Sequence, residues 1–392
     1  MPRGVEALVE PALLAWARTS AGLEVERAAR RAQVSPERLE SWERGDSRPT
    51  VNQLRKLGKA YKRPLAVFYL PEPPRDFQAL RDFRRLPGRV TPPESSELRF
   101  AIRVAQDRRE LALDLYEVIG EEPPRVAFAV TLADEPEHVA TNLRELLKVR
   151  YQDQVRWTAG YEALNRWRAA LEASGVLVFQ AIDVEPSEIR GFSIYADLLP
   201  AIVVNIKDSV RGRVFTMLHE LAHIALRQTG MCDLTEQAQI GTDEQRVEVF
   251  CNRVAGATLV PRDYLLLEDA VAVKRDLEGW TDEEIQALAD RYGASREVIL
   301  RRLLICGRTT EAFYRRKREE LQREYEGAER RREGGFAPPH RIAVSSAGPL
   351  FVRLVLDSYH QDHITASDVA DLLGVRLKHL GRIESEVLRS AS

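Results

Sequence analysis

The motif that most constrains the fold of this chain is His219-Glu220-Leu221-Ala222-His223, which lies inside a strongly helical pattern. Two histidines four residues apart lie one turn apart on the same face of a helix, so both rings can reach one metal ion. Glu220 is then placed to take a proton from an attacking water. The alternative is a charged stretch of surface helix. Apolar residues at helical spacing instead favour an amphipathic helix packed on a core: Val214, Phe215, Leu218, Leu221, Ala222 and Ala225.

Three short apolar segments before this helix predict strands of a small sheet. Residues 201–205 precede the helix directly, and residues 176–179 and 191–195 lie further upstream. Their length and composition are typical of buried strands. A strand beside a metal-binding helix can pair with an extended peptide through backbone hydrogen bonds. The sequence therefore predicts an arrangement that a peptidase needs.

A catalytic zinc requires a third protein ligand, because two histidines do not hold it. The next predicted helix, about residues 242–259, offers Glu244 and Glu248, which lie one turn apart on the flank of its apolar stripe. Asp243 points further away. Helical spacing does not choose between the two glutamates, and the usual place of a glutamate is a solvated helix face.

Two motifs together resemble the ImmA/IrrE family of metallopeptidases: Arg213-Val-Phe-Thr-Met-Leu-His-Glu-Leu-Ala-His223, and Glu248-Val-Phe-Cys-Asn-Arg-Val-Ala255 followed by Leu259-Val-Pro261. In that family the third ligand is the glutamate four residues before the Asn or Asp of the second motif. Asn252 occupies that position, so the resemblance implies Glu248. It also implies a zincin-like fold, with Glu220 as the general base.

The resemblance further implies the metal and the substrate. The family is expected to hold zinc through His219, His223 and Glu248. Manganese is possible, but it favours oxygen ligands more than a site with two histidines offers. The expected substrate is a helix-turn-helix repressor, whose cleavage would relieve repression under stress or for a mobile element. Tyr195 is a candidate for steadying the oxyanion of the reaction.

The first seventy residues predict a separate bundle of short helices at 13–21, 25–32, 36–44, 51–61 and about 64–68. This bundle resembles the XRE/lambda-repressor type of helix-turn-helix domain, in which the third helix reads DNA. Residues 1–70 carry 13 basic and 8 acidic side chains, so this part is mildly basic. The alternative is a docking module that recognises another protein, such as a related repressor.

The side chains of the predicted recognition helix only partly suit DNA. The positions that face bases in such domains hold Pro36, Glu37 and Ser41, and a glutamate beside phosphates usually repels them. Arginines on and after the helix could still bind the backbone. The candidate DNA contacts are Arg38, Ser41, Arg44 and Arg48.

The remaining segments predict the domain order. We expect the helix-turn-helix domain at 1–72, an arm and helical linker at 73–150, the metallopeptidase at 151–309, and a charged helix, hinge and small helical region at 310–392. The expected fold class is α+β and mostly helical. Residues 364–375 have the spacing of a second helix-turn-helix, and a small helical cap is the alternative.

Composition agrees with a cytoplasmic enzyme that has no membrane partner. The chain has 392 residues, 44% of them hydrophobic, and a formal net charge of −2, so no global field indicates nucleic acid or membrane. No apolar run is long enough to cross a bilayer. Three scattered cysteines form no disulfide framework. The sequence therefore predicts a regulatory zinc metalloprotease. The alternative is a DNA-binding transcription regulator or an antitoxin-like partner binder that uses the peptidase fold as a sensor.

Overall fold

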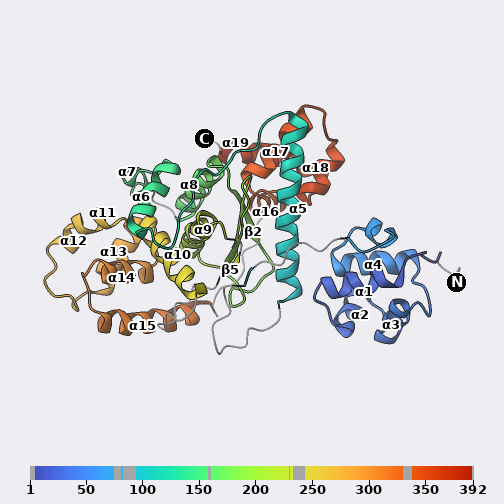
Figure 1. Cartoon of the computed structure of the whole chain (residues 1–392), viewed down its shortest axis with the longest axis horizontal. Coiled ribbons are helices and arrows are strands. Elements are labelled where there is room, and N and C mark those ends of the chain that lie inside the picture. The colour runs from blue at the N-terminus through green and yellow to red at the C-terminus, as the bar shows by residue number, and fades with distance from the viewer. Residues whose placement is uncertain are drawn as a thin grey trace. The chain divides into compact units, whose positions relative to one another are not determined.

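The computed structural model describes residues 5–74, 81–82, 94–157, 160–228, 230–232, 243–329 and 338–390. The chain divides into two compact units. The first comprises Met1–Ala79 and Val90–Gln106, and the second comprises Leu80–Arg89 and Asp107–Ser392. The predicted domain boundaries at residues 72, 150 and 309 stay predictions. The fold is α+β and mostly helical, as expected (Figure 1).

The first unit is a bundle of short helices, and its bounds follow from local capping. Its elements are α1 (Pro11–Ser20), α2 (Val25–Ala32), α3 (Pro36–Arg44), α4 (Val51–Tyr61) and the 3-10 helix η1 (Leu65–Tyr69). Ser35 caps α3 by accepting a hydrogen bond from the Arg38 backbone N–H, and Gly45 ends the helix with a positive φ. Leu39 and Trp42 of α3 are buried in the core of this unit.

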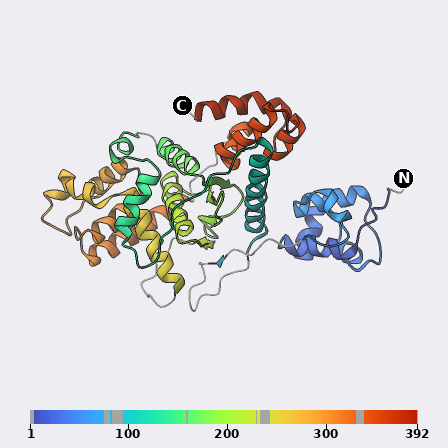
Figure 2. The ribbon, with the colours of Figure 1, turned by 45° about the horizontal axis from the view of Figure 1, so that its top comes forward.

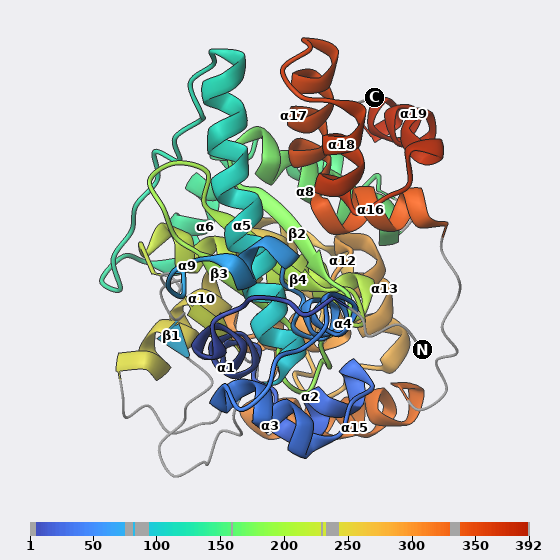
Figure 3. The same cartoon turned by 90° about the vertical axis from the view of Figure 1, so that its right-hand side faces the viewer.

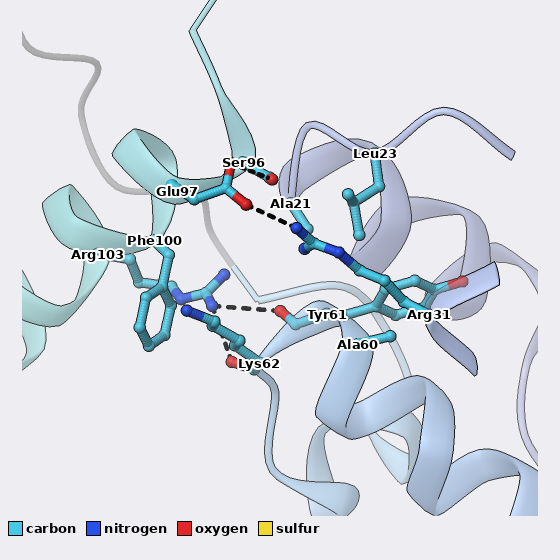
Figure 4. A pocket seen from close by; sticks show the side chains of 10 residues that line it. All are labelled: Ala21, Leu23, Arg31, Ala60, Tyr61, Lys62, Ser96, Glu97, Phe100 and Arg103. Atoms are coloured by element: carbon cyan, nitrogen blue, oxygen red, sulfur yellow. Dashed lines mark hydrogen bonds and ion pairs between the residues drawn. The ribbon is translucent and has the colours of Figure 1, made fainter. Parts of the chain in front are cut away.

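The N-terminal half of α5 (Ser96–Ile119) also belongs to the first unit. Glu97 accepts hydrogen bonds from Arg31 and Arg27 of α2. Arg103 donates to the backbone carbonyls of Tyr61 and Lys62 at the end of α4, 3.3 and 2.8 Å away. Figure 4 shows Glu97, Arg31 and Arg103 around a small pocket between α5 and the bundle. The start of α5 therefore satisfies the free carbonyls at the end of α4.

The second unit is built on a mixed five-stranded sheet with the strand order β1-β5-β3-β4-β2. Its strands are β1 (Arg81–Asp82), β2 (Leu177–Ala181), β3 (Gly191–Ile194), β4 (Ala201–Asn205) and β5 (Gly230–Cys232). β2 is parallel to β4, whereas β3 is antiparallel to both β4 and β5. The three predicted strands are β2, β3 and β4. The short strands β1 and β5 were not predicted, and β1 lies within the arm and helical linker expected at 73–150.

The helix α9 (Val210–Ala225) packs across β3 and β4, and α10 (Asp243–Leu259) packs on α9 (Figure 1). α9 begins at Ser209, whose hydroxyl accepts a hydrogen bond from Gly212 N–H. A Cβ atom on Gly191 of β3 would lie 2.4 Å from the Cγ2 atom of Thr216. Glycine at this position therefore lets α9 approach the sheet closely.

Further helices complete the second unit. These are α6 (Pro136–Leu146), α7 (Tyr151–Gln154), α8 (Gly160–Ala173), α11 (Arg262–Leu267), α12 (Asp269–Ala272), α13 (Asp282–Tyr292), α14 (Arg296–Ile305) and α15 (Glu311–Glu329). α15 is the predicted charged helix, and its Phe313 and Tyr314 are buried in the core.

The C-terminal helices lie together, in red in Figure 2 and labelled in Figure 3. They are α16 (Pro339–Ala347), α17 (Pro349–His360), α18 (Ala366–Leu373), the 3-10 helix η2 (Leu377–His379) and α19 (Leu380–Ser390). α16 covers the outer edge of β2, where Arg168 and the Ser346 hydroxyl donate to the carbonyls of Val178 and Gln180. This edge of the sheet is therefore occupied by the chain itself.

Among the described residues, no helix is both long enough and apolar enough to cross a membrane.

Candidate metal centre

α9 and α10 bring three potential metal ligands together. His219 and His223 lie one turn apart on α9, and their Nε2 atoms are 3.1 Å apart. The carboxylate of Glu248 on α10 lies 3.4 Å from His219 Nε2 and 3.3 Å from His223 Nε2. Both histidines are fully buried, and Glu248 is 9% exposed. Of the two glutamates that spacing left open, the structure places Glu248 with the histidines.

The separations of these atoms fit a tetrahedral metal. With ligand bonds of about 2.0–2.1 Å, two ligand atoms of a tetrahedral zinc lie about 3.3–3.4 Å apart. The three observed separations, 3.1, 3.3 and 3.4 Å, lie close to that value. Two imidazoles and one carboxylate are also a donor set that suits zinc. The three side chains can therefore hold one divalent ion with little rearrangement.

The charges of the three side chains shift one another's pKa values. Burial alone would lower the pKa of His219, but Glu248 raises it, with smaller contributions from Glu220 and Asn252, and the net pKa is raised. Burial alone would raise the pKa of Glu248. His219 and His223 outweigh this effect and lower the pKa to about 2. Glu248 is therefore held as a carboxylate, the form that coordinates a metal.

Glu220 lies beside this cluster on the side that faces β3. It is fully buried, and neither of its carboxylate oxygens has a hydrogen-bond partner among the described residues. Burial raises its pKa, while His223, His219 and the Ser193 hydroxyl, which is close to it but does not meet the geometry of a hydrogen bond, oppose the shift. Its Oε1 atom lies 3.5 Å from the position that a Cβ of Gly191 would take. A buried carboxylate without a partner is costly unless a ligand completes the site.

Asn252 is a neighbour of the metal centre. From the sequence it was identified only as a position in a family motif, and its contribution to the site was not predicted. It lies one turn after Glu248 on α10 and is 3% exposed. It makes a small contribution to the raised pKa of His219, although neither Asn252 Oδ1 nor His219 Nδ1 has a hydrogen-bond partner among the described residues. Ser193 was likewise missed. The sequence held one signal for each residue. Asn252 is spaced one helical turn from Glu248, and Ser193 is a small polar residue that alternates with Phe192 and Ile194 in β3.

A cleft of about 1000 Å³ lies near the metal centre, and its lining includes neighbours of the ligands but not His219, Glu220, His223 or Glu248. Phe215 and Asn252 line it, and the Phe215 ring centroid is 6.4 Å from that of His219. Its walls come mainly from α9, α14 and α15, with the segment 185–190 beside them, and combine apolar side chains with arginines, including Val210, Ile305, Leu321, Arg296, Arg301 and Arg318. The cleft is large enough for several residues of an extended peptide.

Tyr195 is exposed to a moderate degree just after β3, and its hydroxyl donates a hydrogen bond to Asp197 at 2.7 Å. Asp197 raises the pKa of this hydroxyl. The hydroxyl is therefore engaged with Asp197, and a role for Tyr195 at the oxyanion stays a prediction.

The four candidate DNA contacts lie on α3 and in the loop after it. Arg38 lies over the Trp42 ring, with its guanidinium carbon 5.6 Å from the ring centroid. The Ser41 hydroxyl hydrogen-bonds that of Ser47 at 2.7 Å. Arg44 is paired with Asp46 at 2.9 Å and with Glu40 at 3.5 Å. Arg48 is exposed. Two of the three arginines are therefore free of carboxylate partners among the described residues.

Comparison with known protein families identifies two parts of the chain. Residues 171–304 match the family described as IrrE N-terminal-like domain, a peptidase family, and residues 14–68 match the helix-turn-helix family. No curated protein matches the chain significantly. The first match includes α9 and α10, and the second includes α2 and α3. The chain thus combines a metallopeptidase domain of the IrrE N-terminal-like family with an N-terminal helix-turn-helix domain of the XRE type.

Proposed function

We propose that this protein is a regulatory zinc-dependent endopeptidase that cleaves a helix-turn-helix transcriptional repressor in the cytoplasm. The observation that carries the proposal is the convergence of His219, His223 and Glu248 beside the unpartnered carboxylate of Glu220. A set of two imidazoles, one carboxylate and one further acid beside them is suited to peptide hydrolysis.

In the proposed reaction each of these residues has one role. His219, His223 and Glu248 hold the metal, which when bound polarises the scissile carbonyl and makes water more acidic. Glu220 accepts the proton of the attacking water and then passes it to the leaving amine. Asn252 orients the His219 ring. Zinc is the preferred metal, and manganese is the alternative, because two imidazoles favour zinc.

The peptide would lie in the cleft beside the metal centre. An extended substrate can pair with a free sheet edge, and α16 already covers the edge at β2. Pairing of the substrate is therefore expected at the opposite edge of the sheet, which is the edge at β1. A repressor as substrate rests on the resemblance to the ImmA/IrrE family, whose members are expected to relieve repression under stress or for a mobile element.

The N-terminal domain supports a role in transcription regulation. Arg38, Ser41, Arg44 and Arg48 are the proposed DNA contacts, with the arginines binding phosphates. A second candidate function is a DNA-binding regulator, or an antitoxin-like partner binder, in which the peptidase fold acts as a sensor. The helix-turn-helix match at residues 14–68 is the observation that favours it.

A comparison of protein N-termini in cells tests the proposal against this alternative. Cells carrying wild type, Glu220→Gln and the control Glu244→Gln, which removes a charge from α10, would be compared with and without stress. We expect new N-termini confined to one repressor in wild type and the control, and none with Glu220→Gln. Identical protein N-termini in the three kinds of cell under every condition would favour the second candidate function, in which the peptidase fold acts as a sensor.

A further inference from the structure

The C-terminal segment α18–η2–α19 repeats the local geometry of α2 and α3. Both α2 and α18 have eight residues, and both end on a residue with a left-handed backbone, Gln33 (φ 59°) and Gly374 (φ 65°). The next backbone N–H returns to an alanine of the helix in both cases. Val34 donates to Ala29 O at 3.0 Å, and Val375 donates to Ala370 O at 2.9 Å.

The second helix begins at the same distance from this turn in both segments. α3 begins at Pro36, and η2, which continues directly into α19, begins at Leu377. Three buried positions of the two segments then fall in the same register, whereas Ala370 and Leu380, the counterparts of buried Ala29 and Leu39, are half-buried. Ala28, Ala32 and Trp42 of the first correspond to Val369, Leu373 and Ile383 of the second, and all six are buried.

The preceding helix completes the likeness. α17 packs on both α18 and α19, as α1 packs on α3 in the N-terminal bundle. Phe351, Leu354 and Val355 of α17 are buried. The capping box of α18, formed by Thr365 and Asp368, fixes the start of the first helix of the pair. Residues 349–390 therefore have the three-helix arrangement of a helix-turn-helix domain.

The side chains that this arrangement exposes differ in charge between the two copies. In the N-terminal copy the positions that face bases hold Pro36, Glu37 and Ser41. The corresponding residues of the C-terminal copy are Leu377, Lys378 and Arg382. All three are exposed, as is Arg376 in the turn. The C-terminal copy therefore offers two basic side chains, Lys378 and Arg382, where the N-terminal copy has a glutamate and a serine.

The basic side chains of this face are not paired with carboxylates of the described residues. Among the described residues, Arg376, Lys378 and Arg382 form no ion pair, whereas Glu384 and Glu386 of α19 are paired with other residues. Glu384 lies 3.0 Å from His360, and Glu386 lies 3.5 Å from Arg341. The pKa of His379 is lowered by partial desolvation and by the positive charges around it, those of Lys378, Arg382, His340 and Arg376.

We propose that residues 349–390 form a second helix-turn-helix and that its exposed face, Arg376, Leu377, Lys378 and Arg382, binds double-stranded DNA. Lys378 and Arg382 lie one turn apart at the start of the second helix, the part that enters the major groove in such domains. Arginine and lysine there can bind guanine edges or phosphates. This inference goes beyond the proposed peptidase activity and does not depend on it.

The test measures binding of the full-length chain to DNA. A duplex would be selected from a random-sequence pool by the wild-type protein, and its affinity would then be measured by fluorescence anisotropy over a range of salt concentrations. The double variant Lys378→Ala/Arg382→Ala should weaken binding about tenfold or more and reduce the slope of log affinity against log salt by about 2. Both side chains are exposed, so circular dichroism should show an unchanged fold.

Two further double variants make the result decisive. Arg315→Ala/Arg323→Ala removes the same charge from the exposed face of α15 and should leave affinity unchanged. Arg38→Ala/Arg44→Ala reports on the N-terminal copy. An equal loss with the α15 variant would overturn the proposal, because any positive charge would then serve. Unchanged affinity with Lys378→Ala/Arg382→Ala would also overturn it. A wild-type chain that selects no duplex would overturn it as well, and that result is expected if the basic face binds an acidic protein in place of DNA.

Discussion

Glu220 is the residue that most directly distinguishes a catalytic metal site from a structural metal site. It is fully buried, and its oxygens have no hydrogen-bond partner among the described residues. Leaving a buried acid unpaired costs free energy of folding, about 1–3 kcal/mol or more for a charged group. A chain that keeps such a group beside two histidines gains from it only when a ligand or a reaction uses it.

Replacing Glu220 with Gln should abolish cleavage while the metal remains bound. The amide keeps the shape of the side chain but cannot accept the proton, so kcat/KM for the cleaved repressor should fall by about 10²–10⁴-fold. The measurement combines cleavage kinetics with the metal content of the purified protein. Undiminished cleavage by the variant would exclude Glu220 as the base.

Asn252 should act through His219 rather than on the substrate. Replacing it with Ala removes a group that orients the ring, so metal affinity should fall by about 10–100-fold. Asn252→Asp keeps an acceptor at the same place and should restore most of the affinity. Competition with a chelator of known affinity measures both variants. Equal affinities for wild type and Asn252→Ala would show that this residue only fills space.

The contact between β3 and α9 determines how closely the metal helix approaches the sheet. A Cβ at Gly191 would meet Thr216 Cγ2 at 2.4 Å and the Val203 carbonyl at 2.8 Å. Gly191→Ala should therefore lower the free energy of unfolding of the second unit by about 1–3 kcal/mol. Denaturant unfolding measures the change.

The same contact offers an internal check on this prediction. Thr216→Ser removes the methyl group that the new Cβ would meet, so Gly191→Ala/Thr216→Ser should recover part of the lost stability. If the double variant is no more stable than Gly191→Ala, the close approach of helix and strand at Thr216 is not the cause.

The contact of α5 with the N-terminal bundle should depend on pH. Ser96, Arg31 and Arg27 outweigh burial and lower the pKa of Glu97 to about 2. A lowered carboxyl pKa stabilises the folded bundle above the unfolded pKa of about 4.3, and this stability is lost as the pH falls toward 2. Because Glu97 is partly exposed, we expect only about 1 kcal/mol at neutral pH after solvent screening.

Hydrogen exchange of the α2 amides at neutral pH tests this contact. Glu97→Gln should speed the exchange of these amides, because it removes the partner of Arg27 and Arg31. Glu110→Gln, an exposed site on the same helix, should leave the exchange unchanged. Equal exchange in both variants would show that Glu97 does not hold α5 on the bundle.

At the scale of the whole molecule, the sequence predicted the elements with strong periodicity. α10 was predicted within one residue of its bounds, and α9 was predicted as a helix around residues 219–223, because their apolar residues recur at helical spacing. The strands β1 and β5 were missed, because two or three residues carry no pattern and form strands only by pairing with a neighbour. The helix α8 was missed as well, although Trp167 and Leu171 are buried along it.

The candidate site was predictable in part for a similar reason. His219, Glu220 and His223 belong to one local motif, so spacing alone brings them together. The choice of Glu248 over Glu244 needed the family resemblance, because both lie on one flank of α10. The approach of Gly191 and Ser193 to Glu220, and the cleft beside Phe215, arise from tertiary packing, which no local pattern encodes.

The central claim is that His219, His223 and Glu248 form one metal centre, and native mass spectrometry of the full-length chain tests it most directly. Wild type and the α10 control Glu244→Gln should each retain one divalent ion per chain, whereas Glu248→Gln should lose it or retain it far more weakly. A wild-type chain without a metal ion after purification with zinc, or equal retention by Glu248→Gln, would contradict the account.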